Sequence, residues 1–139
     1  MKTNGTERVA HYLDASALVK LAVHEAESAA LFAWAKGYGG DALVTSDIAR
    51  TELMRALRRS APDAAQRGRI VLESVTLIGL SPQILDAAGR LEPVTLRSLD
   101  AIHLSSALAL GDDLESLVTY DERLADATRA YGIPVTAPA

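Results

Sequence analysis

Cysteine is absent from this 139-residue sequence, which excludes a disulfide framework, a thiolate zinc site and a cysteine nucleophile. Aromatic residues make up only 4% of the chain, so a surface that stacks nucleic-acid bases is not expected. No apolar run approaches the roughly 18 to 20 residues that span a bilayer. Residues 1–8 are polar and lack the apolar stretch of a secretion signal. We therefore expect a cytoplasmic protein with no membrane segment.

Basic residues are in the minority. Lys and Arg total 14 against 18 Asp and Glu, which gives a formal charge of −4. A general basic coat for nucleic acid is therefore missing, and such a partner would have to meet a local patch. The hydrophobic fraction of 49% and the length suit one domain with a buried core. We expect a single domain over residues 1–139, in which residues 1–8 form a flexible polar lead.

Short apolar runs alternate with longer helical stretches along the chain. The pattern predicts strands at 9–13, 42–45, 75–80, 114–119 and 133–136, and helices at 17–23, 25–36, 48–59, 63–74, 82–91, 95–110 and 122–131. Ser16 is the predicted cap of the first helix. The strands are nearly all apolar, which indicates burial on both faces and right-handed crossovers between parallel strands. We predict a three-layer α/β/α sandwich with a parallel sheet of four to five short strands.

Two predicted strands are each followed by an aspartate and then by a helix. Asp14 follows the first of these strands, and Asp121 follows the strand at 114–119. Ligands of open parallel sheets bind at the carboxyl ends of the strands, so the two acids would face each other if their strands are neighbours. The alternative is that each aspartate only caps the helix after it.

Two further acids lie on predicted helices. Asp100 lies on a helix that is apolar around most of its circumference, where an ionised carboxylate is costly unless it is paired or binds a metal. The structural alternative is a buried aspartate that accepts hydrogen bonds from the backbone or from Arg97. Glu52 lies at the edge of the core-facing side of its helix, and its alternative is a solvated pair with Arg55. His103 is interpreted as a core histidine and is left out of the site.

Acids that converge at one site repel each other, and a divalent cation relieves that repulsion. Magnesium and manganese prefer oxygen ligands, and such sites activate water and stabilise the charge on a phosphoryl group. If the four acids meet, we expect metal-dependent phosphodiester chemistry. Two other functions stay open: a phosphoacceptor or phosphatase-like acidic domain, and a non-catalytic scaffold that binds RNA or a partner through the same groove.

Four segments together resemble the motifs of a PIN domain, and in particular those of the toxin subunit of a VapBC-type toxin–antitoxin pair. They are YLDASALVK at 12–20, SDIARTEL at 46–53, LRSLDAIHL at 96–104 and VTYDERL at 118–124. The resemblance extends over the whole chain. It implies an endoribonuclease that uses Mg²⁺, for which Mn²⁺ can substitute. The implied catalytic acids are Asp14, Glu52, Asp100 and Asp121; the metal ligands among them are Asp14, Asp100 and Asp121, and Ser16 and Thr119 support the carboxylates.

The resemblance also implies partners. It implies RNA as substrate, a cognate antitoxin that holds the protein inactive, and a homodimer or toxin–antitoxin hetero-oligomer. Arg55, Arg59 and Arg97 are the predicted RNA-binding cations. For Arg55 and Arg59 the alternative is an ordinary solvated helix surface, and for Arg97 it is pairing with the neighbouring acid.

Overall fold

The protein is described here by a computed structural model of residues 9–139, so the predicted polar lead at residues 1–8 lies outside the described residues. Five strands form one sheet in the order β3-β2-β1-β4-β5, and every neighbouring pair is parallel. The strands are β1 (Ala10–Leu13), β2 (Leu43–Ser46), β3 (Thr76–Ile78), β4 (Leu114–Val118) and β5 (Val135–Thr136). This arrangement confirms the predicted α/β fold with a parallel sheet.

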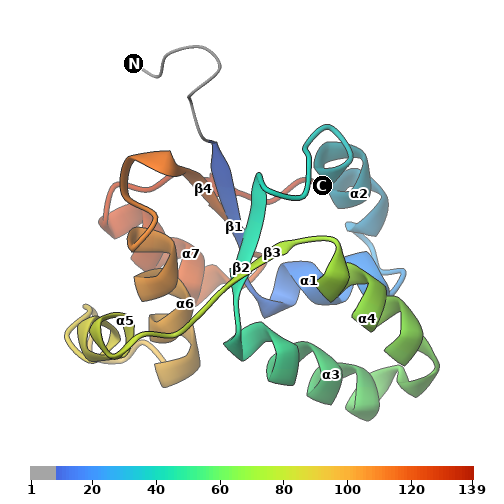
Figure 1. Cartoon of the computed structure of the whole chain (residues 1–139), viewed down its shortest axis with the longest axis horizontal. Helices are drawn as coiled ribbons and strands as arrows, with labels where there is room; N and C mark the ends of the chain where they lie inside the picture. Colours follow the sequence, from blue (N-terminus) through green and yellow to red (C-terminus); the bar gives the residue numbers. More distant parts are fainter. Residues whose placement is uncertain (1–8) are drawn as a thin grey trace.

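Helices cover both faces of the sheet (Figure 1). One face packs against α1 (Ala15–Ala22), α2 (Ser28–Ala35), α3 (Ile48–Ser60) and α4 (Ala65–Glu73). The other packs against α6 (Ser98–Leu108) and α7 (Glu122–Ala130), and α5 (Pro82–Ala88) packs on α6. Two short 3₁₀ helices, η1 (Pro62–Ala64) and η2 (Gly111–Asp113), precede α4 and β4. The predicted three-layer sandwich is therefore confirmed. Every helix within residues 9–139 is too short or too polar to span a bilayer.

The central strands β1 and β2 are buried on both faces, and accordingly neither of them contains an Asp, Glu, Lys or Arg residue. Successive residues of a strand point to opposite sides. Tyr12 and Leu117 accordingly pack with the helices α6 and α7, whereas Leu13 and Val118 pack with α1 and α3. Each layer of helices thus has its own core against one face of the sheet.

The strands β1 and β4 are neighbours in the sheet, with Leu13 opposite Val118. Because all strands run in the same direction, the residues that follow β1, β2 and β4 emerge at one edge. Asp14 follows β1 and leads directly into α1, while Thr119 to Asp121 connect β4 to α7. This edge, which we call the carboxyl edge, is where the sequence places its strand-end acids.

Several boundaries differ from the predicted ones, and three of the differences, all at helix starts, have a clear local cause. The first helix is capped by Asp14 and not by Ser16. Asp14 is the single residue between β1 and α1, and its Oδ1 atom accepts the Ala17 N–H at 3.0 Å. The helix α2 begins at Ser28 and not at residue 25, since the Ser28 hydroxyl ties down the preceding turn by bonds to Glu25 N–H and the Val23 carbonyl. The helix α6 begins at Ser98, because Arg97 is extended.

Candidate active site

Asp14 is buried at the carboxyl edge, with 3% of its surface exposed. Its Oδ1 atom accepts hydrogen bonds from the Ser16 hydroxyl at 2.6 Å and from the Ala17 N–H at 3.0 Å. Its Oδ2 atom accepts one from the Thr119 hydroxyl at 2.5 Å. Burial raises the pKa of Asp14 above its ordinary value, and the bonds from Ser16 and Thr119 partly oppose that rise. An ionised Asp14 is thus a desolvated charge held in one orientation.

Thr119 connects Asp14 to the next acid along the edge. Its hydroxyl oxygen accepts the N–H of Asp121 at 3.0 Å while the hydroxyl proton goes to Asp14. Asp121 uses Oδ1 to accept the N–H groups of Arg123 and Leu124, which caps α7. Its second oxygen, Oδ2, contacts Arg97. Asp121 therefore caps α7, and it also lies at the carboxyl edge of the sheet. The two roles that the sequence offers for it, helix cap and strand-end acid, occur together.

Arg97 bridges two of the candidate acids. Its Nη2 atom lies 3.0 Å from Asp100 Oδ2 and 2.7 Å from Asp121 Oδ2. Burial raises the pKa of Asp100, whereas the hydrogen bond and the charge of Arg97 lower it. The same contacts raise the pKa of Arg97. The predicted alternative of pairing with the neighbouring acid thus holds for Arg97, and its contact with RNA stays a prediction.

Glu52 reaches the site from α3 and contacts His103, which is predicted to be a core histidine outside the site. Its Oε1 atom lies 2.5 Å from Nε2 of His103, which is itself 1% exposed. This contact replaces the expected pair with Arg55. The other ring nitrogen of His103 lies 2.7 Å from the Tyr12 hydroxyl. His103 is a core histidine, as expected, yet it touches a candidate catalytic acid; its position one helical turn after Asp100 was the available signal.

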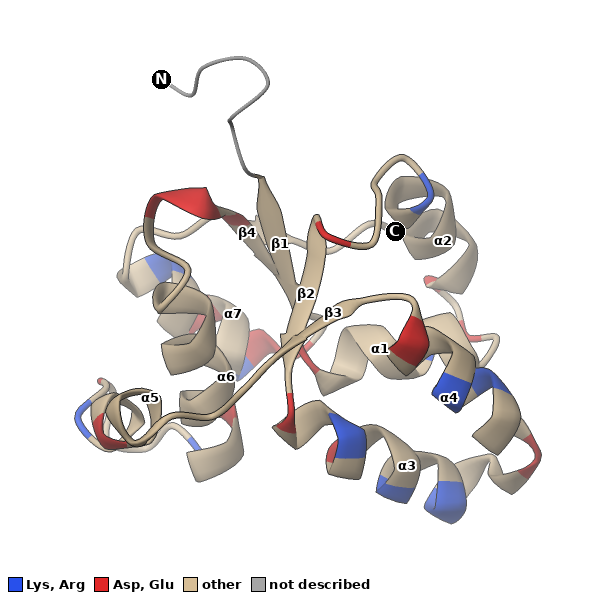
Figure 2. Cartoon of the chain, viewed as in Figure 1, with Lys and Arg blue, Asp and Glu red and all other residues tan. Residues whose placement is uncertain are grey.

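A groove lies beside the acids, between α1 and α3. Its cavity of about 420 Å³ is lined by Ser16, Glu52, Arg55, Arg59 and Leu99, among others. Basic positions recur along α3 in the picture of the charges (Figure 2). The two predicted RNA-binding arginines of α3 therefore line the same groove as one of the candidate acids.

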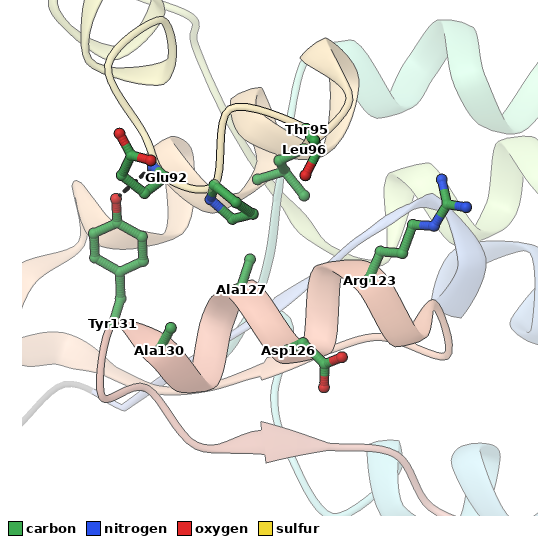
Figure 3. A pocket seen from close by; sticks show the side chains of 9 residues that line it. Glu92, Thr95, Leu96, Arg123, Asp126, Ala127, Ala130 and Tyr131 are labelled. Carbon is green, nitrogen blue, oxygen red and sulfur yellow. Dashed lines mark hydrogen bonds between the residues drawn. The ribbon is translucent and has the colours of Figure 1, made fainter.

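A second cavity, of about 780 Å³, lies beside α7 and contains none of the four acids in its lining. Its middle is lined by the apolar side chains of Leu96 and of Ala127 on α7, which lie opposite each other (Figure 3). Arg123 lies at one end. At the other end the Tyr131 hydroxyl accepts the Glu92 N–H at 2.8 Å. The acids and this cavity are thus separate features of the surface.

The candidate acids occupy one edge but do not form a closed metal cage. Within residues 9–139, no group of three or more His, Asp or Glu side chains lies close enough to hold a metal ion. The donor set nevertheless suits a hard cation, since it consists of carboxylate and hydroxyl oxygens. One nitrogen of Arg97 already contacts two of the carboxylates, Asp100 and Asp121. A metal bound by all three predicted ligands would require these side chains to move closer together.

This combination of fold and acids is that of a known family. Residues 11–130 match the family model described as PIN domain. The chain therefore belongs to the PIN domain family and, within it, to the group of VapC proteins, which confirms the resemblance seen in the four motifs.

Two curated relatives illustrate the group. The chain is similar to Ribonuclease VapC46 of Mycobacterium tuberculosis, at 46% identity over 127 residues that cover 91% of this chain and 96% of the relative. It is 39% identical over 131 residues to Ribonuclease VapC47 of the same species, with the same two coverages. Among solved structures, a chain of a toxin–antitoxin complex from Klebsiella pneumoniae has the same fold, with a TM-score of 0.70 at 22% identity over 94% of this chain and 98% of that one.

Proposed function

We propose that this protein is a metal-dependent endoribonuclease that hydrolyses RNA phosphodiester bonds, and that it is a toxin neutralised by a cognate antitoxin. The observation that carries the proposal is the gathering of acids from four separate segments at one edge of a PIN-domain sheet, beside a groove with two arginines. The names of the curated relatives point to the same activity.

Each acid has a distinct part in the proposed reaction. Asp14, Asp100 and Asp121 are the proposed metal ligands, and Glu52 orients the attacking water. Ser16 and Thr119 hold Asp14 by donating hydrogen bonds to its two oxygens, a support that keeps a metal-binding carboxylate in one orientation. Arg97 offsets part of the negative charge of Asp100 and Asp121.

The proposed metal is Mg²⁺, with Mn²⁺ as a substitute, because both prefer carboxylate oxygens. When bound, such an ion lowers the pKa of water and stabilises the charge that develops on the phosphoryl group. The raised pKa values of Asp14 and Asp100 fit this assignment, since a desolvated carboxylate gains from a nearby cation.

The test is cleavage of a labelled RNA by the purified protein in Mg²⁺, in Mn²⁺ and in EDTA. We expect cleavage with either metal and none in EDTA. Asp14→Asn and Asp100→Asn keep the side-chain shape but remove the charge, and we expect each to abolish cleavage. Asp126→Asn, at a side chain that is 78% exposed, is the matched control. A folded Asp14→Asn protein that cleaves RNA at the wild-type rate would overturn the proposal.

The arginines of the groove are proposed to bind RNA phosphates. Each phosphate contact to a single strand contributes about 0.7 to the slope of log affinity against log salt. We therefore expect the double change of Arg55 and Arg59 to Gln to make RNA binding less sensitive to salt, with the slope less steep by roughly 1 to 1.5. The same change at Arg129, which lies on α7 away from the groove, should leave the slope unaltered.

The proposed partners are an antitoxin and a second copy of the chain, as a homodimer or a toxin–antitoxin hetero-oligomer. Since RNA is the proposed substrate, the cytoplasm is the proposed compartment. Co-expression with any short reading frame that adjoins this gene tests the pairing. A stable complex without ribonuclease activity is expected, and full activity in the presence of the co-expressed product would contradict it.

A further inference from the structure

The contact between Glu52 and His103 joins the two helical layers of the protein. Glu52 lies on α3 and His103 lies on α6, and these helices pack on opposite faces of the sheet (Figure 1). Their side chains meet at 2.5 Å, between Oε1 and Nε2. The carboxylate belongs to the proposed catalytic acids, whereas the imidazole has no part in the reaction proposed above.

His103 is held from the other side by a buried hydrogen-bonded chain. Its Nδ1 atom lies 2.7 Å from the Tyr12 hydroxyl, which donates to the Ser46 hydroxyl at 2.9 Å. Tyr12 and Ser46 are fully buried, on the adjacent strands β1 and β2. Both ring nitrogens are therefore engaged, and rotation of the ring would break two contacts at once. The imidazole is anchored to two adjacent strands of the sheet, β1 and β2.

Glu52 needs such a support. A glutamate side chain has three rotatable bonds and loses much rotamer freedom when it is held in one place. The Glu52 side chain is 18% exposed and lines the groove that also contains Arg55, one helical turn further along α3. Without His103, the carboxylate would be free to turn toward solvent or toward Arg55.

We propose that His103 is a positioning residue for Glu52, and that Tyr12 and Ser46 hold His103 in the orientation this requires. His103 is too deeply buried to touch RNA, so it acts only through the carboxylate. This role rests on the proposed ribonuclease function. It predicts that changes at His103 affect the chemical step and leave the binding of RNA nearly as it is.

The first experiment compares two replacements of His103 by their kcat and KM on an RNA substrate. His103→Leu fills similar space but has no donor, and loss of such an outer support typically costs about 10- to 100-fold in activity. We expect that loss in kcat, with KM within about twofold of wild type. His103→Gln places an amide N–H near the position of Nε2 and should recover most of the activity. The exposed His24, changed to Leu, is the control.

The second experiment asks whether His103 acts through Glu52. In a Glu52→Gln background, adding His103→Leu should lower kcat by no more than about twofold, because the positioned group is already lost. The proposal would be overturned if the kcat losses of Glu52→Gln and His103→Leu multiplied in the double variant. A His103→Leu protein with wild-type kcat would overturn it as well. If His103→Leu does not fold, His103→Gln and His103→Asn replace it. The Asn amide is too short to reach Glu52, so equal activity of these two proteins would also overturn the proposal.

A third measurement needs no catalysis. In protein with ¹⁵N-labelled histidine, we expect the His103 imidazole N–H resonance to move in the Glu52→Gln variant and the His24 signal to stay in place. An unmoved His103 signal would overturn the contact itself. A wild-type chain that cleaves no RNA would overturn the proposed function and the positioning role together. Cleavage by wild type with equal cleavage by His103→Leu would overturn the positioning role alone.

Discussion

Asp14→Asn should make the protein more stable at neutral pH while it removes the proposed activity. The wild-type carboxylate is buried, and its pKa is raised even though three donors point at it. Desolvation therefore exceeds the combined effect of those hydrogen bonds. Asparagine keeps the shape and the acceptor that serves Ser16 and Ala17, and it carries no charge to desolvate.

The expected size of the effect comes from two opposing contributions. Each pH unit by which the folded pKa of Asp14 exceeds its ordinary value destabilises the folded state by about 1.4 kcal/mol at neutral pH. Against this, the hydrogen bond that the Thr119 hydroxyl donates to Asp14 is lost, and the hydroxyl must turn to accept an N–H of the new amide. We expect this exchange to cost about 1 kcal/mol. Stabilising substitutions of single residues commonly gain about 0.5 to 2 kcal/mol. We expect a gain of that order, which is a rise in Tm of roughly 2 to 8 °C.

The dependence on pH has a definite sign. Because the folded pKa of Asp14 lies above its ordinary value of 3.8, the folded state binds a proton more readily than the unfolded state. The stability of the wild type therefore falls as pH rises through the folded pKa. The advantage of Asp14→Asn should shrink as pH is lowered toward 3.8 and change little below it.

Urea unfolding of both proteins in EDTA, at several pH values between about 4 and 8, measures this difference. Asp126→Asn is the control, since its side chain is 78% exposed, and we expect its stability to follow that of the wild type. An Asp14→Asn protein that is less stable than wild type at neutral pH, or whose advantage does not depend on pH, would refute the reasoning.

Three further predictions concern other contacts. Arg97→Gln should raise the pKa of Asp100 further, because the hydrogen bond and the charge of Arg97 lower it in the wild type. A ¹³C NMR titration of the Asp100 carboxyl in EDTA measures this pKa, and no rise would contradict the contact between Arg97 and Asp100. Leu53→Ala, at a fully buried position of α3, should cost about 2 to 5 kcal/mol in urea unfolding, and a loss below about 1 kcal/mol would argue against its place in the core. Ser81→Ala removes the hydroxyl that accepts the Ile84 N–H and should cost about 1 kcal/mol, whereas Ser81→Asp should restore the cap.

The sequence was sufficient for the architecture. Strands without charged residues, such as β1 and β2, are buried on both faces, because the side chains of alternate residues point to opposite sides. Asp14 and Asp121 could also be selected from the sequence by their place after buried strands, and Asp100 by its place on an apolar helix, where a charge is costly without a purpose. Glu52 joined them through the family resemblance. Helix starts were less predictable. They depend on single hydrogen bonds, such as that from the Ala17 N–H to Asp14 in place of a Ser16 cap.

The partners of the acids were decided by the tertiary structure alone. The periodicity of α3 suggested Arg55 as the neighbour of Glu52, yet the residue in contact is His103, which comes from a helix on the other face of the sheet. Likewise Thr119 reaches Asp14 only because β1 and β4 are neighbours in the sheet. Spacing along a chain reports which residues share a strand or a helix. Contacts between elements depend on the order and packing of the strands, and so these required the fold.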